Sequence, residues 1–218
     1  MIMPATHFFL PAPIVRLTVG HMHCFEQILE TARHADGLAH YNCPYPKFEF
    51  LFYLTQRKHY LLHGSPRANI GRFEPPRPVA ALDHSVAVYA TDHEISAMFA
   101  AVRPDSRLTL SGYFWARDDY NRPNPFYDFS FQAGGRSLGA WSAGVIYVLP
   151  RAAFDPWGSE WASRGAVTPL LKLPVLPEDF PLLSAIQRHE AQLTGEALPA
   201  GGFVAAFDSD HSAPHAAV

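Results

Sequence analysis

The stretch Tyr60-Leu-Leu-His-Gly-Ser-Pro (residues 60–66) decides how the middle of the chain folds. Its apolar start is typical of a short strand, and Gly64 and Pro66 predict a turn directly after it. The stretch therefore predicts a short strand that leads into a turn.

A second motif follows downstream. Residues 86–90 (Val-Ala-Val-Tyr-Ala) predict another short strand. Thr91-Asp-His-Glu94 has the form of a capping box, in which the Thr91 hydroxyl accepts from the backbone N–H of Glu94 and the Glu94 carboxylate reaches back. The helix that this box starts is predicted to end at Pro104. Its inward side chains are predicted to be Ile95, Met98, Phe99 and Val102.

The first 58 residues predict one strand and two helices. Residues 12–19 are predicted as a short strand, and residues 21–35 as a helix with one apolar face. Pro46 suits the first position of a helix, so a second helix is predicted from there to about residue 58.

The rest of the chain predicts mostly strands. Aromatic and β-branched residues concentrate in four segments, 107–116, 125–133, 143–149 and 167–175. A last helix is predicted over residues 177–193, and the tail after Phe207 has little to bury and is predicted to be disordered. Because helices and strands are segregated along the chain, an α+β fold is predicted.

Composition limits the kind of protein that this can be. The chain has 218 residues, of which 48% are hydrophobic and 17% charged, so it can form one large domain with a sizeable core. A formal net charge of −3 gives no broad attraction for nucleic acid. Cys24 and Cys43 make no disulfide framework, so a reducing compartment is expected. Without a long apolar run or a basic N-terminal region, no membrane span or signal peptide is expected, and the predicted location is cytoplasmic.

The stretch from Tyr60 to Phe73 resembles the His-Gly-Ser or His-Gly-Thr segment of poly- and mono-ADP-ribosyltransferases. In that family an apolar strand delivers a histidine, then glycine and a hydroxyl residue, with an asparagine a few positions on. The resemblance implies that NAD is the cofactor, consumed as a substrate. It further implies that His63 holds the adenosine-ribose side of NAD and that the Gly64 backbone fixes the nicotinamide carboxamide. Ser65 matches the hydroxyl residue of the cofactor site.

The second motif resembles the strand, turn and helix that follow in the same family. On this alignment Tyr89 is the tyrosine of a His-Tyr-Glu triad, and Ser96 is the hydroxyl that meets the carboxamide. Phe99 matches an aromatic residue that stacks on the nicotinamide ring. The family has tyrosine at that position, and phenylalanine keeps the stacking face without the hydroxyl. The helix lies one residue closer to Tyr89 than in the family pattern.

The resemblance makes Glu160 the third member of the triad. Ser159-Glu160-Trp161 precedes a late strand, like the Glu-aromatic strand near the end of the family's catalytic domain. A carboxylate there hydrogen-bonds the 2′-OH of the nicotinamide ribose and stabilises positive charge as the glycosidic bond lengthens. The implied reaction cleaves the nicotinamide–ribose bond and transfers ADP-ribose to an acceptor. That acceptor stays open between a protein, a nucleic acid and a small molecule, and water would make the enzyme a glycohydrolase.

The resemblance covers roughly residues 60–175 and implies a fold as well as a reaction. That fold is an ADP-ribosyltransferase-like core of two small packed antiparallel sheets with flanking helices, preceded by an N-terminal helical segment. The domain boundaries follow from it. Residues 1–58 form a strand and helix segment on the core, residues 59–203 form the NAD-binding core with its C-terminal helix, and residues 204–218 form a disordered tail.

Each candidate residue also has a structural alternative. His63 can be a strand-end histidine bonded to a neighbouring carbonyl. The other aromatic and hydroxyl residues, Tyr89, Ser96 and Phe99, can be ordinary packing residues. Glu160 can be a solvated carboxylate, as most glutamates are. If Glu160 lies outside the pocket, the same fold would act as an NAD or ADP-ribose binding module without turnover. A structural or partner-binding protein is the third alternative.

Two other motifs predict less. His21 and His23 are two residues apart and do not share a helix face, so no metal site is expected. Residues 134–139 (Gly-Gly-Arg-Ser-Leu-Gly) lack the Lys-Ser/Thr ending of a phosphate-binding loop. We therefore expect a hairpin turn there.

Overall fold

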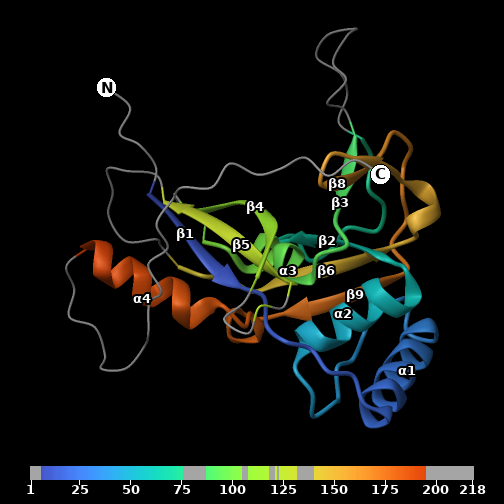
Figure 1. The fold of residues 1–218 in the computed structure, drawn as a ribbon. Helices are drawn as coiled ribbons and strands as arrows, with labels where there is room; N and C mark the ends of the chain where they lie inside the picture. The colour runs from blue at the N-terminus through green and yellow to red at the C-terminus, as the bar shows by residue number, and fades with distance from the viewer. Residues whose placement is uncertain are drawn as a thin grey trace, which may run out of the picture.

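The computed structural model describes residues 6–75, 87–104, 108–117, 121, 123–131 and 140–194. Within these ranges the chain combines helices with antiparallel sheets, so the predicted α+β class is confirmed. The described strands form three small sheets of three strands each, where the sequence predicted two (Figure 1). The predicted turn at Gly134-Gly135 and the predicted disordered tail after Phe207 both lie outside the described residues.

The central sheet holds the His-Gly-Ser strand. It has the order β2-β6-β9, with β2 at Leu61–Ser65, β6 at Gly144–Leu149 and β9 at Leu171–Val175. Every residue of β6 is buried, because both faces of this sheet are covered. Leu62, Ile146 and Leu173 belong to the larger apolar cluster on one face. Leu61 and Tyr147 belong to a smaller cluster on the other face.

The second sheet pairs the first described strand with two strands from the middle of the chain. Its order is β1-β5-β4, with β1 at Thr6–Pro11, β5 at Pro123–Phe131 and β4 at Leu108–Arg117. Alternation along the strands turns Tyr127 and Phe129 into the larger core cluster, while Phe9 and Phe114 stay on the exposed face.

The third sheet is short and lies at the upper right of Figure 1. Its order is β3-β8-β7, with β3 at Val88–Ala90, β8 at Glu160–Ser163 and β7 at Asp155–Trp157. The β7 residues are all exposed. An isolated antiparallel bridge between Leu62 and Thr91 joins this sheet to the central one.

Four α-helices surround the sheets within the described residues: α1 at Val19–Arg33, α2 at Lys47–Lys58, α3 at Glu94–Val102 and α4 at Leu183–Thr194. The predicted inward face of α1 is confirmed, because Phe25, Ile28, Leu29 and Ala32 are buried. Two short 3₁₀ helices, η1 at Arg151–Ala153 and η2 at Pro177–Asp179, complete the described elements. The predicted helix over residues 177–193 is therefore η2 followed by α4.

Helix α3 packs directly on β2 because Gly64 carries no side chain. A Cβ at Gly64 would lie 1.8 Å from the carbonyl oxygen of Ala97. Real Cβ atoms do not come this close to backbone, so only glycine permits this contact. The glycine predicted to approach a ligand thus also brings a helix onto the strand.

Two local predictions are wrong. Residues 12–18 contain no strand, and the strand of this region is β1, which begins six residues earlier, where pairing with β5 satisfies the backbone. The capping box is also absent, since α3 begins at Glu94 with His93 as its N-cap and no side-chain cap bond. The Thr91 hydroxyl instead accepts from the backbone N–H of His93, at 3.1 Å. The backbone of Thr91 is fully used by its bridge to Leu62.

Cys24 and Cys43 form a disulfide between α1 and the segment before α2. The sequence predicted a reducing compartment from these two cysteines, so this bond was not expected. Among the described residues, none of the helices has both the length and the apolar character needed to cross a membrane.

Candidate functional site

The two sequence motifs meet where β2 and β3 separate. Leu62 and Thr91 exchange both backbone hydrogen bonds, at 2.8 and 2.9 Å. In an antiparallel pair the next such exchange would join Gly64 to Tyr89, since N–H groups of alternate residues point to the same side. That exchange is not made, because the bridge is isolated. Within the described residues, the N–H and C=O of Gly64 therefore point into a split between the strands.

His63 occupies part of this split. Its Nδ1 lies 2.8 Å from the backbone oxygen of Tyr89, the atom that would otherwise face Gly64. A carbonyl only accepts, so Nδ1 carries the proton and Nε2 is left as an acceptor. The ring packs at 4.7 Å from the ring of Phe73. The structural alternative for His63, a bond to a neighbouring carbonyl, is thus present in the structure, and it leaves one ring nitrogen for other partners.

The side chains of His63 and Tyr89 lie on opposite faces. His63 faces the smaller apolar cluster, which includes Phe73, Val88 and Ala90. Tyr89 stands between Val88 and Ala90 in β3, so alternation directs its half-buried side chain the other way. The resemblance implies that both side chains open into one cleft. The structure brings together the imidazole and the backbone of Tyr89 instead.

Glu160 lies on the same face of the third sheet as Tyr89. Tyr89 pairs with Ala162, and Glu160 is two residues before Ala162 on β8. Its side chain is exposed, at the end of a hairpin where it pairs with Trp157. The structure thus brings the three motif strands together in the order β2, β3, β8, with Glu160 at the solvent edge.

The remaining candidate residues lie on β2 and α3. Ser65 is buried at the end of β2, and its Oγ accepts from the backbone N–H of Arg67 at 3.1 Å. Ser96 is half-buried in the first turns of α3. Phe99 is 1% exposed and packs against the rings of three other core residues, Phe129, Trp141 and Phe180. The ring of Phe99 is therefore part of the core.

An arginine stands next to the motif strands. The guanidinium of Arg151 lies 3.8 Å from the ring centre of Trp161, the residue paired with Ala90 in β3. Its Nη1 is 3.7 Å from a carboxylate oxygen of Asp92. A guanidinium fixed by stacking on an indole is a typical site for a phosphate or carboxylate.

Sequence reasoning missed a cluster at the start of α3. The ring of His93 lies 3.5 Å from the ring of Tyr113 on β4 and 6.4 Å from that of Tyr127 on β5. Glu94 is 7% exposed and Tyr127 is 1% exposed. The sequence contains three titratable residues in a row, Asp92-His-Glu94, but the sequence pattern assigned them to a capping box. Only the packing of the second sheet over this turn shows that the cluster is buried.

Burial shifts the proton equilibria of this cluster. It raises the pKa of Glu94 to about 7, chiefly because the carboxylate is removed from water. It lowers the pKa of His93, and the carboxylate of Asp92 opposes that change. It raises the pKa of the Tyr127 hydroxyl, with a further increase from Glu94. These groups thus favour their neutral forms beside the β2–β3 split.

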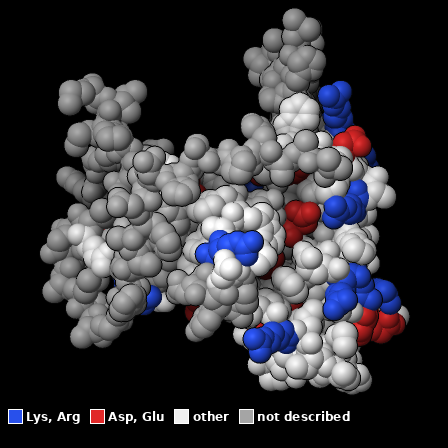
Figure 2. All heavy atoms as spheres, viewed as in Figure 1, with Lys and Arg blue, Asp and Glu red and all other residues white. Residues whose placement is uncertain are grey.

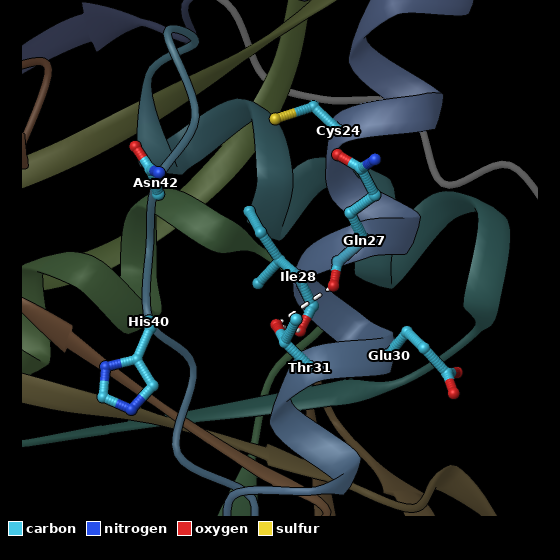
Figure 3. Close-up of a pocket in the computed structure, with 7 residues that line it drawn as sticks. All are labelled: Cys24, Gln27, Ile28, Glu30, Thr31, His40 and Asn42. Carbon is cyan, nitrogen blue, oxygen red and sulfur yellow. Dashed lines mark hydrogen bonds between the residues drawn. The ribbon is translucent and has the colours of Figure 1, made fainter.

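A separate cavity of about 550 Å³ lies on α1, far along the chain from the motifs. Figure 3 shows His40 and Asn42 on the facing segment, across from the α1 side chains. Two of its polar groups on α1 already have partners: the Thr31 hydroxyl donates to the carbonyls of Gln27 and Ile28, and Glu30 pairs with Arg33 and His34. We therefore do not include this cavity in the candidate site.

Charge gives no further indication of a ligand. On the face shown in Figure 2, basic and acidic side chains are interspersed over the described residues. No group of three or more histidine, cysteine or acidic residues within the described residues could hold a metal ion. Comparison with known proteins found no family model, curated protein or solved structure that matches this chain.

Proposed function

We propose that this chain binds NAD at the split between β2 and β3 and acts as an ADP-ribosyltransferase-like enzyme. The observation that carries the proposal is the open backbone edge of Gly64, left unpaired by the described residues beside the Leu62–Thr91 bridge. A strand edge presents an N–H donor and a C=O acceptor side by side. A primary carboxamide presents the complementary pair, so the edge suits the amide of nicotinamide.

Tyr89 and Glu160 are assigned to one part of NAD in this proposal and His63, whose side chain lies on the opposite face, to another, while Phe99 has no role because its ring is part of the core. Tyr89 and Glu160 share a face of the third sheet, so the tyrosine can cover the nicotinamide ring while the carboxylate approaches the adjoining ribose. Positive charge develops on that ribose as the glycosidic bond breaks, and a nearby carboxylate stabilises it. Nε2 of His63 accepts from a ribose hydroxyl. Arg151 offers its guanidinium to the diphosphate.

The second candidate function is a binding module without turnover. The exposure of Glu160 favours it, because a solvated carboxylate stabilises a developing cation less than a buried one does. In either function the predicted cytoplasmic location remains an expectation, and so does an acceptor of ADP-ribose.

Ligand-dependent melting separates these functions from a purely structural role. A ligand that binds only the folded protein raises the melting temperature according to RT ln(1 + [L]/Kd). We expect NAD and nicotinamide to raise it. Nicotinic acid is the matched control, because its carboxylate cannot donate to the Gly64 carbonyl, and we expect no rise with it. Equal rises with both pyridines, or none with NAD, would contradict the proposed site.

Nicotinamide release separates the enzyme from the binding module. Glu160→Gln keeps the shape of the side chain and removes its charge, so NAD affinity should stay within a few-fold. Release should fall by about a hundredfold, because the carboxylate acts mainly in the transition state. Glu178→Gln, an equivalent change at an exposed position, is the control and should behave as the native chain. If the native chain binds NAD but releases no nicotinamide, the binding module is the function.

A further inference from the structure

The start of α1 contains three side chains in the arrangement of a hydroxyl-activating triad. Oγ1 of Thr18 lies 2.6 Å from Nδ1 of His21. Nε2 of the same ring lies 2.8 Å from Oε2 of Glu49 on α2. A hydroxyl, an imidazole and a carboxylate in this order form the unit that activates a nucleophile in many hydrolases, whatever the fold.

The backbone fixes the tautomer of His21. The backbone N–H of Thr18 donates to Nδ1 at 3.2 Å, so Nδ1 is an acceptor and Nε2 carries the proton. Nδ1 can therefore take the proton of the Thr18 hydroxyl. At the same time the backbone N–H of His21 donates to Oγ1 at 3.4 Å, which stabilises negative charge on that oxygen. The second contact favours loss of the hydroxyl proton, whereas the first holds Nδ1 ready as an acceptor and is given up when the ring takes the proton.

Neighbouring groups hold the ring in place. The ring of Tyr45 stacks on that of His21 with 3.6 Å between centres. Gly20 permits this approach, since a Cβ there would lie 2.6 Å from the Tyr45 hydroxyl. The side chains of His21 and Glu49 are 12% and 17% exposed. Oε2 of Glu49 is buried and makes no aligned hydrogen bond within the described residues, so its charge faces the imidazole and can stabilise an imidazolium.

The residue that carries the hydroxyl lies at the surface. Thr18 is exposed, and the neighbouring Val19 is 78% exposed, which places an apolar side chain beside it. The backbone N–H groups of residues 19 and 20 belong to the first turn of α1 and have no partner within the helix. Such groups can bind the oxyanion that forms when a hydroxyl attacks a carbonyl.

We propose that Thr18, His21 and Glu49 form a second reactive site, which takes up acyl groups from activated esters. Oγ1 of Thr18 attacks the ester carbonyl carbon, and its proton moves to Nδ1 of His21. The bond from that carbon to the leaving oxygen then breaks, and Nδ1 of His21 returns its proton to that oxygen, or to solvent when the leaving group is a phenolate; the alcohol departs, an ester is left on Thr18, and the imidazole is neutral again. Water attacks this ester with His21 as base, so the carboxylic acid departs and the hydroxyl is restored.

Reaction of the full chain with p-nitrophenyl acetate tests this. We expect release of nitrophenolate, with one acetyl group on Thr18 by peptide mass mapping. Thr18→Asn is the main control, because asparagine caps a helix as well as threonine but has no hydroxyl. It should lose the acetylation while melting as the native chain does. Thr18→Ser should keep the reaction.

Two further variants separate activation from capping. His21→Gln should slow acetylation by about a hundredfold, the usual contribution of a general base. Glu49→Gln should slow it by at least about tenfold, since the imidazolium loses its carboxylate. Acetylation confined to lysines, or equal rates in Thr18→Asn and the native chain, would overturn the proposal.

Discussion

The central sheet and the third sheet have the same number of strands but opposite surroundings. All six residues of β6 in the central sheet are buried, whereas all three residues of β7 in the third sheet are exposed. Helix α3 packs against β2, so the central sheet is held from both faces. The third sheet is joined to it through the Leu62–Thr91 bridge. A rigid strand and a less supported one thus meet at the candidate site, so one side can adapt to a ligand while the other fixes its position.

The largest expected effect comes from forcing α3 away from the central sheet. Gly64→Ala would place a Cβ 1.8 Å from the Ala97 oxygen, and backbone must move to accept it. We expect a loss of about 4 kcal/mol or more in the free energy of unfolding, measured by urea denaturation. Gly71→Ala is the matched control, because nothing lies within 4 Å of its added Cβ, and it should change stability little. Equal losses would mean that the helix contact is not tight.

Two truncations, one in each sheet, compare how much side-chain packing in the central and third sheets contributes to the free energy of unfolding. Ile146 in β6 is fully buried, and Ile146→Ala should cost about 3 kcal/mol in unfolding free energy. Trp157 in β7 is 49% exposed, and Trp157→Ala should cost less than about 1 kcal/mol although more atoms are removed. If Trp157→Ala cost as much as Ile146→Ala, the third sheet would be as firmly held as the central one.

An effect that depends on pH concerns the buried carboxylate at the start of α3, where the central and second sheets meet. Burial raises the pKa of Glu94 from its ordinary 4.5 to about 7, so between these pH values the folded chain holds a proton that the unfolded chain has released. Stability is therefore lost as the pH rises through this range, and it stays lower above it. Glu94→Gln cannot ionise and avoids that loss.

Urea denaturation at two pH values measures this effect. At pH 8 we expect Glu94→Gln to be more stable than the native chain by on the order of 2 kcal/mol. At pH 4.5 the two chains should be nearly equal, since Glu94 is then neutral in the folded protein. A difference that is the same at both pH values would show that the substitution acts through packing and not through the proton.

Local sequence patterns were enough to predict most of the helices. The predicted helices at 21–35 and 46–58 correspond to Val19–Arg33 and Lys47–Lys58, because a 3.6-residue apolar period is visible without knowledge of partners. The strand near the N-terminus was predicted at residues 12–19 but lies at residues 6–11. The two segments have similar composition, so local sequence does not distinguish them. What distinguishes them is pairing with β5, far along the chain.

The candidate site was predictable only in part, for the same reason. Motif order placed the strands of His63, Tyr89 and Glu160 in one region, and the structure does make them neighbours. Whether the side chains of Tyr89 and His63 lie on the same face depends on the register in which their strands pair, and no local sequence pattern encodes that register. The burial of Glu94 depends on the second sheet, and the contact of His21 with Glu49 depends on the packing of α1 on α2.

The pairing of β1 with β5 also sets an order of events during synthesis. Thr6 pairs with Phe131, so this strand leaves the ribosome long before its partner strand has been made. Until then Phe8 and Phe9 are on an unpaired strand that other chains could bind. Helices α1 and α2, whose contacts are local, can form in that interval. The second sheet therefore closes late, and it is the part of the molecule where slow or crowded synthesis would first produce misassembled chains.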